Sequence, residues 1–159
     1  MYICLANGES VNFFHRICEC FRGVRDPGDT RADRGVFGEN LAADYCRNEL
    51  GYRLIVRNWS HKKGEIDLIC QDGEVLVFIE VRARAKDALV SGFHSVSRRK
   101  KEILHRTCKS YLRQLKNPPK HFRFDIVDIS ICNTGQSKVR HYANVPIFHK
   151  HFSIQRGEL

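Results

Sequence analysis

The feature that most constrains the fold is a continuous apolar run, VLVFI at residues 75–79, inside a segment of strand-like composition. A strand with one face in water alternates polar and apolar side chains, whereas a strand without alternation is covered on both faces. A chain that contains such a strand needs layers on both sides of its sheet. The run therefore predicts an α/β fold in which helices flank a mixed sheet.

Strands and helices are predicted on both sides of this run. Residues 65–70 and 74–83 are rich in β-branched side chains and are joined by Asp72-Gly73, a strong hairpin signal. Ser97 is a good N-cap for a helix that begins at Arg98, and Gly51 is a candidate C′ residue for an earlier helix. In chain order we predict a helix within residues 36–52, strands at 52–59, 65–70 and 74–83, a helix at 98–115 and a strand at 121–132, which is α-β-β-β-α-β.

By composition the chain has three parts. Residues 1–33 are predicted to be an N-terminal extension and linker, with a short helix around Val11–Phe21. Residues 34–132 form the α/β domain, and residues 133–159 form a C-terminal tail in which residues 145–154 predict one short strand. A length of 159 residues suits one domain with a core of its own.

The charge of the chain indicates its class of partner. It has 27 Lys and Arg against 18 Asp and Glu, a net charge of +9. Such a surface favours a polyanion, nucleic acid first and an anionic membrane surface second, although many small basic proteins bind neither. No window approaches the apolar length of a membrane helix, so we expect no membrane partner.

Cysteine usage indicates the compartment. The seven cysteines are odd in number and contain no CxxC pair, which argues against a zinc ribbon or a thioredoxin-type site. The first residues lack the pattern of a signal peptide. We therefore expect a cytoplasmic protein with mostly free thiols. The sequence defines no oligomeric state, and a homodimer is compatible with it.

The hairpin places charges where a core is expected. With Asp72-Gly73 as the turn, Glu65 falls opposite Glu80, and Asp67 and Glu80 are diagonal neighbours. Alternation then puts one set of charged side chains on a single face: Glu65, Asp67, Glu80 and Arg82. The other face is apolar: Leu68, Cys70, Val75, Val77, Ile79 and Val81.

Grouped acids repel one another unless a cation compensates their charge. Mg²⁺ suits this task, because it prefers carboxylate oxygens and keeps waters that a phosphate can replace. Arg82 projects from the same face as Glu80, where such a phosphate would lie. The alternative is an inert ion network on the surface of the sheet.

Several segments together resemble a known family. They are GE at residues 38–39, RNW at 57–59, GEIDLI at 64–69, VFIEVRAR at 77–84, the basic helix, and RFDIV at 123–127. This combination resembles the YraN family of uncharacterised bacterial proteins, which belongs to the restriction-endonuclease-like superfamily with its PD-(D/E)xK pattern. The resemblance covers roughly Gly35 to Asp128.

The resemblance implies roles for four residues. Asp67 matches the Asp of the superfamily pattern, Glu80 the acid of its (D/E)xK element, and Arg82 the lysine position. Glu39 matches the first-helix acid that completes many such sites. Asp67 and Glu80 would bind Mg²⁺ or Mn²⁺, and Glu39 would contribute directly or through water. Arginine cannot serve as a general base near neutral pH, so Arg82 would hold a phosphate or stabilise charge.

Further basic residues are candidates for contact with the nucleic-acid backbone. Charge on a helix is usually only its solvated face, and Trp59 suits core packing better than stacking on a base. The predicted phosphate contacts are Arg57, Lys62, Lys63, Arg84, Arg98, Arg99 and Lys101.

These inferences lead to one expected function and two alternatives. We expect a restriction-endonuclease-like, Mg²⁺-dependent endonuclease, a phosphodiester hydrolase that acts on structured or branched DNA. The first alternative is a non-catalytic nucleic-acid-binding module that keeps the nuclease fold. The second is a structural protein whose charged face is only an ion network.

Overall fold

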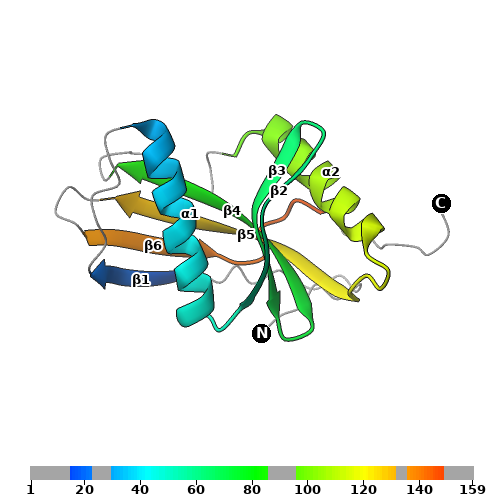
Figure 1. Cartoon of the computed structure of the whole chain (residues 1–159), viewed down its shortest axis with the longest axis horizontal. Helices are drawn as coiled ribbons and strands as arrows, with labels where there is room; N and C mark the ends of the chain where they lie inside the picture. Colours follow the sequence, from blue (N-terminus) through cyan, green and yellow to red (C-terminus); the bar gives the residue numbers. More distant parts are fainter. Residues whose placement is uncertain (1–14, 23–29, 86–95, 132–135, 149–159) are drawn as a thin grey trace.

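A six-stranded sheet between two helices forms the protein (Figure 1). The structure is a computed structural model, and it describes residues 15–22, 30–85, 96–131 and 136–148. Its elements in chain order are β1 (His15–Arg22), α1 (Arg31–Asn48), β2 (Arg53–His61), β3 (Gly64–Asp72), β4 (Val75–Ala85), α2 (Arg98–Gln114), β5 (His121–Ile131) and β6 (Gln136–Tyr142). The predicted α/β class and the order α-β-β-β-α-β from α1 to β5 are confirmed.

The strand order in the sheet is β1-β6-β5-β4-β3-β2. All neighbouring pairs are antiparallel except β4 and β5, which are parallel and are connected through α2. The β2–β3 hairpin crosses the direction of the other strands steeply (Figure 1). The sheet is therefore mixed, as predicted, and strongly twisted at one end.

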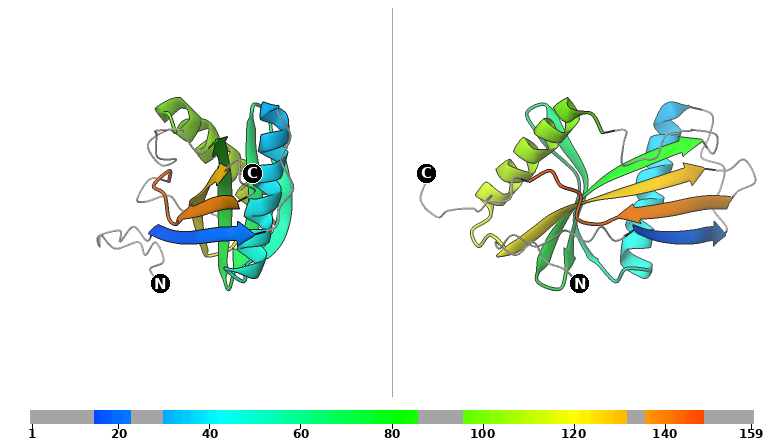
Figure 2. Two further views of the ribbon diagram at one scale, coloured as in Figure 1. Left: turned by 90° about the vertical axis from the view of Figure 1, so that its left-hand side faces the viewer. Right: turned by 180° about the vertical axis from the view of Figure 1, so that it is seen from behind.

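The two helices cover opposite faces of the sheet (Figure 2). Under α1 the core contains every side chain of the predicted apolar face of the hairpin: Leu68, Cys70, Val75, Val77, Ile79 and Val81. Under α2, Leu76 and Phe78 are buried with Leu104 and Leu112. The continuous apolar run in β4 is thus explained, because both of its faces are core.

The sequence predictions are wrong at three places outside the central elements. Residues 15–22, inside the segment expected to hold a short helix, form strand β1, which pairs with β6. The final strand is Gln136–Tyr142 rather than residues 145–154, of which 145–148 are not strand and 149–154 lie outside the described residues. The first helix begins at Arg31 with Thr30 as its N-cap, inside the predicted linker. Gly51, the predicted C′ residue of this helix, has a φ of 69°. It follows the C-cap Glu49 by two residues and so lies one residue beyond the C′ position.

The hairpin register also differs from the prediction. Asp72 pairs with Val75, so the two loop residues are Gly73 and Glu74. Every pairing shifts by two residues, and the ladder ends with Leu68 opposite Ile79, so the predicted pairing of Glu65 with Glu80 does not form and Asp67 is the β3 residue next to the end of the ladder. A glycine with positive φ suits either position of a two-residue loop, so local sequence could not choose between the registers.

Neither α1 nor α2, the two helices among the described residues, is long and apolar enough to cross a membrane.

Candidate active site

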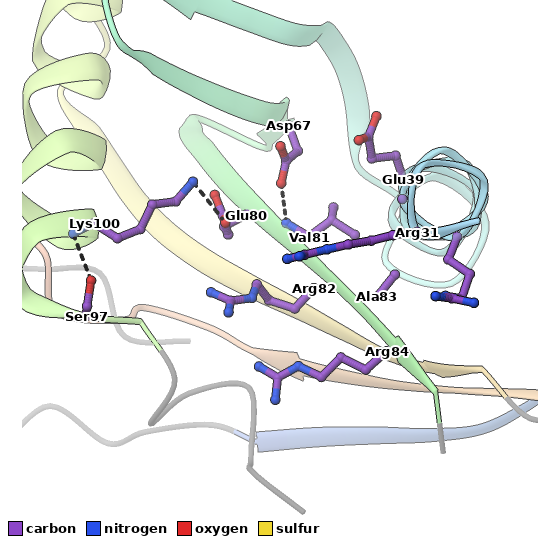
Figure 3. Close-up of a pocket in the computed structure, with 12 residues that line it drawn as sticks. Arg31, Glu39, Asp67, Glu80, Val81, Arg82, Ala83, Arg84, Ser97 and Lys100 are labelled. Atoms are coloured by element: carbon purple, nitrogen blue, oxygen red, sulfur yellow. Dashed lines mark hydrogen bonds and ion pairs between the residues drawn. The ribbon is translucent and has the colours of Figure 1, made fainter. Parts of the chain in front are cut away.

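A cleft lies at the carboxyl end of β4, between the amino ends of α1 and α2 (Figure 3). Its volume is about 750 Å³. Polar and charged side chains dominate its lining: Arg31, Arg34, Glu39, Asp67, Glu80, Arg82, Arg84, Ser97 and Lys100, with Gly35, Val81 and Ala83. All four predicted catalytic residues are in this list, so the fold brings them into one cleft.

Gly38 allows α1 to approach β4 closely. A Cβ atom at this buried glycine would overlap the Cβ of Ala83 on β4. The absence of a side chain therefore brings the helix backbone against the strand. The next residue, Glu39, consequently lines the cleft from α1, across from the wall that α2 forms (Figure 3).

Asp67 lies at the point where β3 separates from β4. The last β3–β4 pair is Leu68 with Ile79, and beyond it β3 pairs only with β2. The backbone N–H of Val81 donates a hydrogen bond to Oδ2 of Asp67 at 2.6 Å. The side chain of Asp67 thus accepts a main-chain hydrogen bond near the end of the β3–β4 ladder, from the residue that follows Glu80.

Glu80 is a buried carboxylate with one oxygen paired and one oxygen unpaired. Its Oε1 lies 3.2 Å from Nζ of Lys100, which reaches across from the first turn of α2. Its Oε2 is buried and has no hydrogen-bond partner among the described residues. A buried acceptor without a partner is costly, and it marks a position where a ligand can bind.

The pKa values of both carboxylates are raised, mainly because the groups are removed from water. Burial, and then the charges of Glu80 and Glu39, raise the pKa of Asp67 to about 7, against the lowering effect of the Val81 hydrogen bond. Burial also raises the pKa of Glu80, although Lys100 and Arg82 oppose the shift. Ionising both acids is therefore costly in this environment, and a bound divalent cation would lower that cost.

Four arginines complete the lining. Arg82 and Arg84 project from the same side of β4 as Glu80, and Arg31 and Arg34 come from the first turn of α1 (Figure 3). Nε of Arg84 lies 3.9 Å from the buried carboxylate of Asp128. With Lys100, five cationic side chains face three carboxylates, so the cleft as a whole attracts anions.

The donor set fits a hard divalent cation at two carboxylates. Asp67 and Glu80 offer oxygen ligands, and the unpaired Oε2 of Glu80 provides a free acceptor. Across the described residues, no group of three or more His, Cys, Asp or Glu is arranged to hold a metal ion. Mg²⁺ commonly binds through one or two carboxylates and retains waters, so the pair suffices. The contribution of Glu39, directly or through water, stays a prediction.

The predicted phosphate contacts divide between the cleft and the surface. Arg84 lines the cleft, whereas Arg98, Arg99 and Lys101 lie at the start of α2 outside its lining. Lys62 and Lys63 are exposed in the β2–β3 turn.

Two residues of β2 that the sequence singled out do not line the cleft and contact other parts of the fold instead. Arg57 donates to Oδ1 of Asn40 at 2.7 Å and is thereby tied to α1. Trp59 packs edge-on against Tyr111 with ring centroids 5.1 Å apart, as expected of a core residue.

Sequence reasoning missed three lining residues: Arg31, Arg34 and Lys100. Arg31 lies in the predicted linker and Arg34 at the first position of the predicted domain, yet Thr30 is an N-cap residue, and 31, 34 and 39 lie on one side of the helix that follows. Lys100 was passed over between Arg99 and Lys101 in a uniform basic run. No local signal separates it from these neighbours, because its role depends on where α2 meets β4.

The RFDIV segment serves the fold rather than the cleft. Asp125 is fully buried, accepts hydrogen bonds from Arg123 and from the N–H of Asn144, and lies 2.9 Å from Nε2 of His141. Arg123 also donates to Asp72. Arg123 pairs in register with Val77, whereas the cleft begins at Glu80, so this network ties together the opposite end of the sheet.

Comparison with known proteins identifies a single family over most of the α/β core. Residues 38–129 match the model of a family described as uncharacterised protein family UPF0102. A UPF0102 protein of Dichelobacter nodosus (strain VCS1703A) is 42% identical over 105 residues, which cover 66% of this chain and 82% of that protein. A UPF0102 protein of Chlorobium limicola (strain DSM 245 / NBRC 103803 / 6330) is 37% identical over 108 residues, 68% of this chain and 83% of that protein. A UPF0102 protein of Mycolicibacterium vanbaalenii is 35% identical over 117 residues, which cover 74% of this chain and 96% of that protein.

Proposed function

The chain belongs to the uncharacterised protein family UPF0102, which is the YraN family that its motifs resemble, and from this premise we propose that it is a metal-dependent nuclease. Its reaction would be hydrolysis of phosphodiester bonds, with structured or branched DNA as the substrate class that the family resemblance implies. A cytoplasmic location is part of the proposal, because the cysteines in the described residues, Cys46, Cys70 and Cys108, are free thiols.

One observation carries the proposal: the buried carboxylate of Glu80 and the partly buried carboxylate of Asp67 meet in a cleft that five cationic side chains line. Acids alone would indicate a cation site, and bases alone an anion site. Their combination suits a phosphate bound together with a divalent metal ion.

The residues of the chain divide the work by their chemistry. Asp67 and Glu80 would hold Mg²⁺ or Mn²⁺, which when bound supplies Lewis-acid activation of water and neutralises charge on the phosphate. Arg82 and Arg84 would bind phosphate oxygens, since a guanidinium offers two parallel donors. Arg82 stays charged at neutral pH, so it stabilises negative charge and takes no proton from water.

The test is cleavage of linear duplex, single-stranded and four-way-junction DNA with Mg²⁺ and with Mn²⁺. We expect the wild type to cleave at least one of these substrates and to lose activity with a chelator. Glu80→Gln and Asp67→Asn should abolish cleavage, and calorimetry should show weaker metal binding by both. Arg82→Ala should lose about 10²–10³-fold in rate, as when one transition-state donor is removed, and Arg82→Lys should lose less. Robust cleavage by both Arg82→Ala and Glu80→Gln would place the active site elsewhere.

A second candidate function is a non-catalytic nucleic-acid-binding module. The observation that favours it is the absence, among the described residues, of a three-carboxylate metal group, together with arginine at the lysine position. In that case the wild type binds DNA and shows no metal-dependent cleavage, and Arg82→Lys restores some activity. The same three proteins and substrates therefore separate the two functions.

A further inference from the structure

The first turn of α2 has a charge pattern that opposes helix stability. It contains four consecutive cations, Arg98 to Lys101, and no acidic residue. The amino end of a helix carries partial positive charge, so cations there are unfavourable and anions are favourable. Ser97 caps the turn by accepting the N–H of Lys100 at 3.3 Å. The pattern suggests that an anion near this turn compensates the charge.

Lys100 is the member of this run that meets such an anion in the cleft. Its Nζ lies 3.2 Å from Oε1 of Glu80, and it contributes to the cleft lining. Arg98, by contrast, is 95% exposed and pairs with Glu102 of the same helix. Figure 3 shows Lys100 extending from α2 toward Glu80.

The side chains of the two partners of this ion pair differ in conformational freedom. The side chain of Glu80 is 8% exposed on a central strand, whereas that of Lys100 is 42% exposed at the end of a four-carbon stem. Lys100 can therefore swing into the cleft while Glu80 stays in place. Oε2 of Glu80 remains available to a second cation, since it has no partner among the described residues.

We infer that Lys100 is a displaceable counter-ion: it neutralises Glu80 in the metal-free protein, and a divalent cation at Asp67 and Glu80 releases it to bind a substrate phosphate. This inference rests on the proposed function. It assigns to a helix residue the amine that the PD-(D/E)xK pattern places on the strand and that this chain replaces by Arg82. Lys100 keeps its charge throughout and changes only its partner.

Competition between two cations for one carboxylate predicts effects of opposite sign. Removing the Lys100 charge removes a competitor and a repulsive charge, so the divalent ion should bind more tightly. The same substitution removes a phosphate-binding group, so cleavage should slow. A purely structural ion pair would not combine tighter metal binding with slower cleavage, because its loss would leave metal affinity unchanged or lower it.

The experiment measures Mn²⁺ affinity by calorimetry at pH 8, above the pKa of about 7 of Asp67. Lys100→Gln should bind Mn²⁺ roughly tenfold more tightly than the wild type, a change that corresponds to the removal of one nearby charge. It should also cleave DNA at least about tenfold more slowly at saturating metal. Lys100→Arg should keep an affinity near that of the wild type, because the charge is retained.

Arg106→Gln is the matched control, since it removes the same charge from an exposed position on α2, where the guanidinium donates to the backbone oxygen of Glu102. Its Mn²⁺ affinity should equal that of the wild type.

Equal or weaker Mn²⁺ binding by Lys100→Gln, or binding by neither protein, overturns the inference. Because affinity is measured without DNA, a wild type that cleaves while Lys100→Gln shows unchanged affinity refutes the role of Lys100 and leaves the nuclease proposal intact. Tighter metal binding without cleavage by any protein supports the counter-ion and refutes the nuclease.

Discussion

Asp67 is under electrostatic strain in the metal-free protein. It is partly buried, it faces Glu80, and it accepts a single backbone hydrogen bond from Val81. Its pKa rises from 3.8 to about 7, so the folded state binds its proton more tightly than the unfolded chain does. The free energy of unfolding therefore decreases as pH rises between these two values, and the full penalty is present above pH 7.

Asp67→Asn should remove this penalty in the absence of metal, because the amide oxygen can still accept from Val81 and carries no charge. We expect the substitution to increase the free energy of unfolding by about 2 kcal/mol more at pH 8 than at pH 5. Urea denaturation with a chelator at both pH values measures the difference. Asp44→Asn, at an exposed carboxylate of α1, should show the same small effect at both. An Asp67→Asn effect that does not depend on pH would mean that this carboxylate ionises without penalty in the folded protein.

At the scale of elements, two glycines determine how the helices meet the sheet. A side chain at Gly38 would overlap Ala83, and one at Gly64 would overlap Oγ1 of Thr107 on α2. Gly38 brings α1 against β4, and Gly64 brings the β2–β3 hairpin against α2. Each glycine precedes a glutamate in the sequence, so the two Gly-Glu pairs that contribute to the family resemblance are contact points between layers.

Gly38→Ala tests this close approach. The added methyl meets a Cβ atom attached to strand backbone, which cannot move aside cheaply, so we expect a loss of about 2 kcal/mol of unfolding free energy. In the double variant Gly38→Ala/Ala83→Gly the clash is absent, and a double-mutant cycle should show favourable coupling. Gly35→Ala is the control on the same helix: nothing lies within 4 Å of the added carbon, and it should be neutral or stabilising. Equal losses at positions 35 and 38 would show that helix propensity, and not contact with β4, explains the result.

At the scale of the whole molecule, the basic residues follow α2 toward the cleft. The contact between Gly64 and Thr107 places Lys62 and Lys63 beside the middle of α2, and Arg98, Arg99 and Lys101 lie at its amino end. The cleft, which Arg82 and Arg84 line, lies next to this end of α2. The net charge of +9 is therefore distributed along a path that a nucleic-acid backbone could follow.

Salt dependence tests this path. Replacing Arg98, Arg99 and Lys101 together by Ala should reduce the slope of log affinity for DNA against log salt by about 2–3, roughly one for each lost phosphate contact. The control variant replaces Arg53, Lys116 and Lys120 with Ala. It makes the same change in net charge at exposed positions near the opposite end of the sheet. Its slope should stay close to that of the wild type. Equal slopes for the two triples would mean that total charge, and not the α2 path, governs binding.

The sequence alone determined much of the fold and part of the site. Period-two alternation in the hairpin identified the apolar face that packs under α1, and the VLVFI run implied layers on both sides of the sheet. Ser97 and Arg98 were correctly predicted as the cap and first residue of α2. These properties follow from interactions within a few residues. Asp67, Glu80 and Arg82 could be named because they lie within one such hairpin.

Only the tertiary structure decided the rest, because it depends on contacts between distant segments. The hairpin register shifted by two residues, since Gly73 suits either loop position and the packing of both faces makes the choice. Residues 15–22 form a strand because β6 offers an edge for pairing, which no local pattern records. Lys100 joins the site because the amino end of α2 lies beside Glu80, whereas the basic residues on either side of it in sequence do not line the cleft.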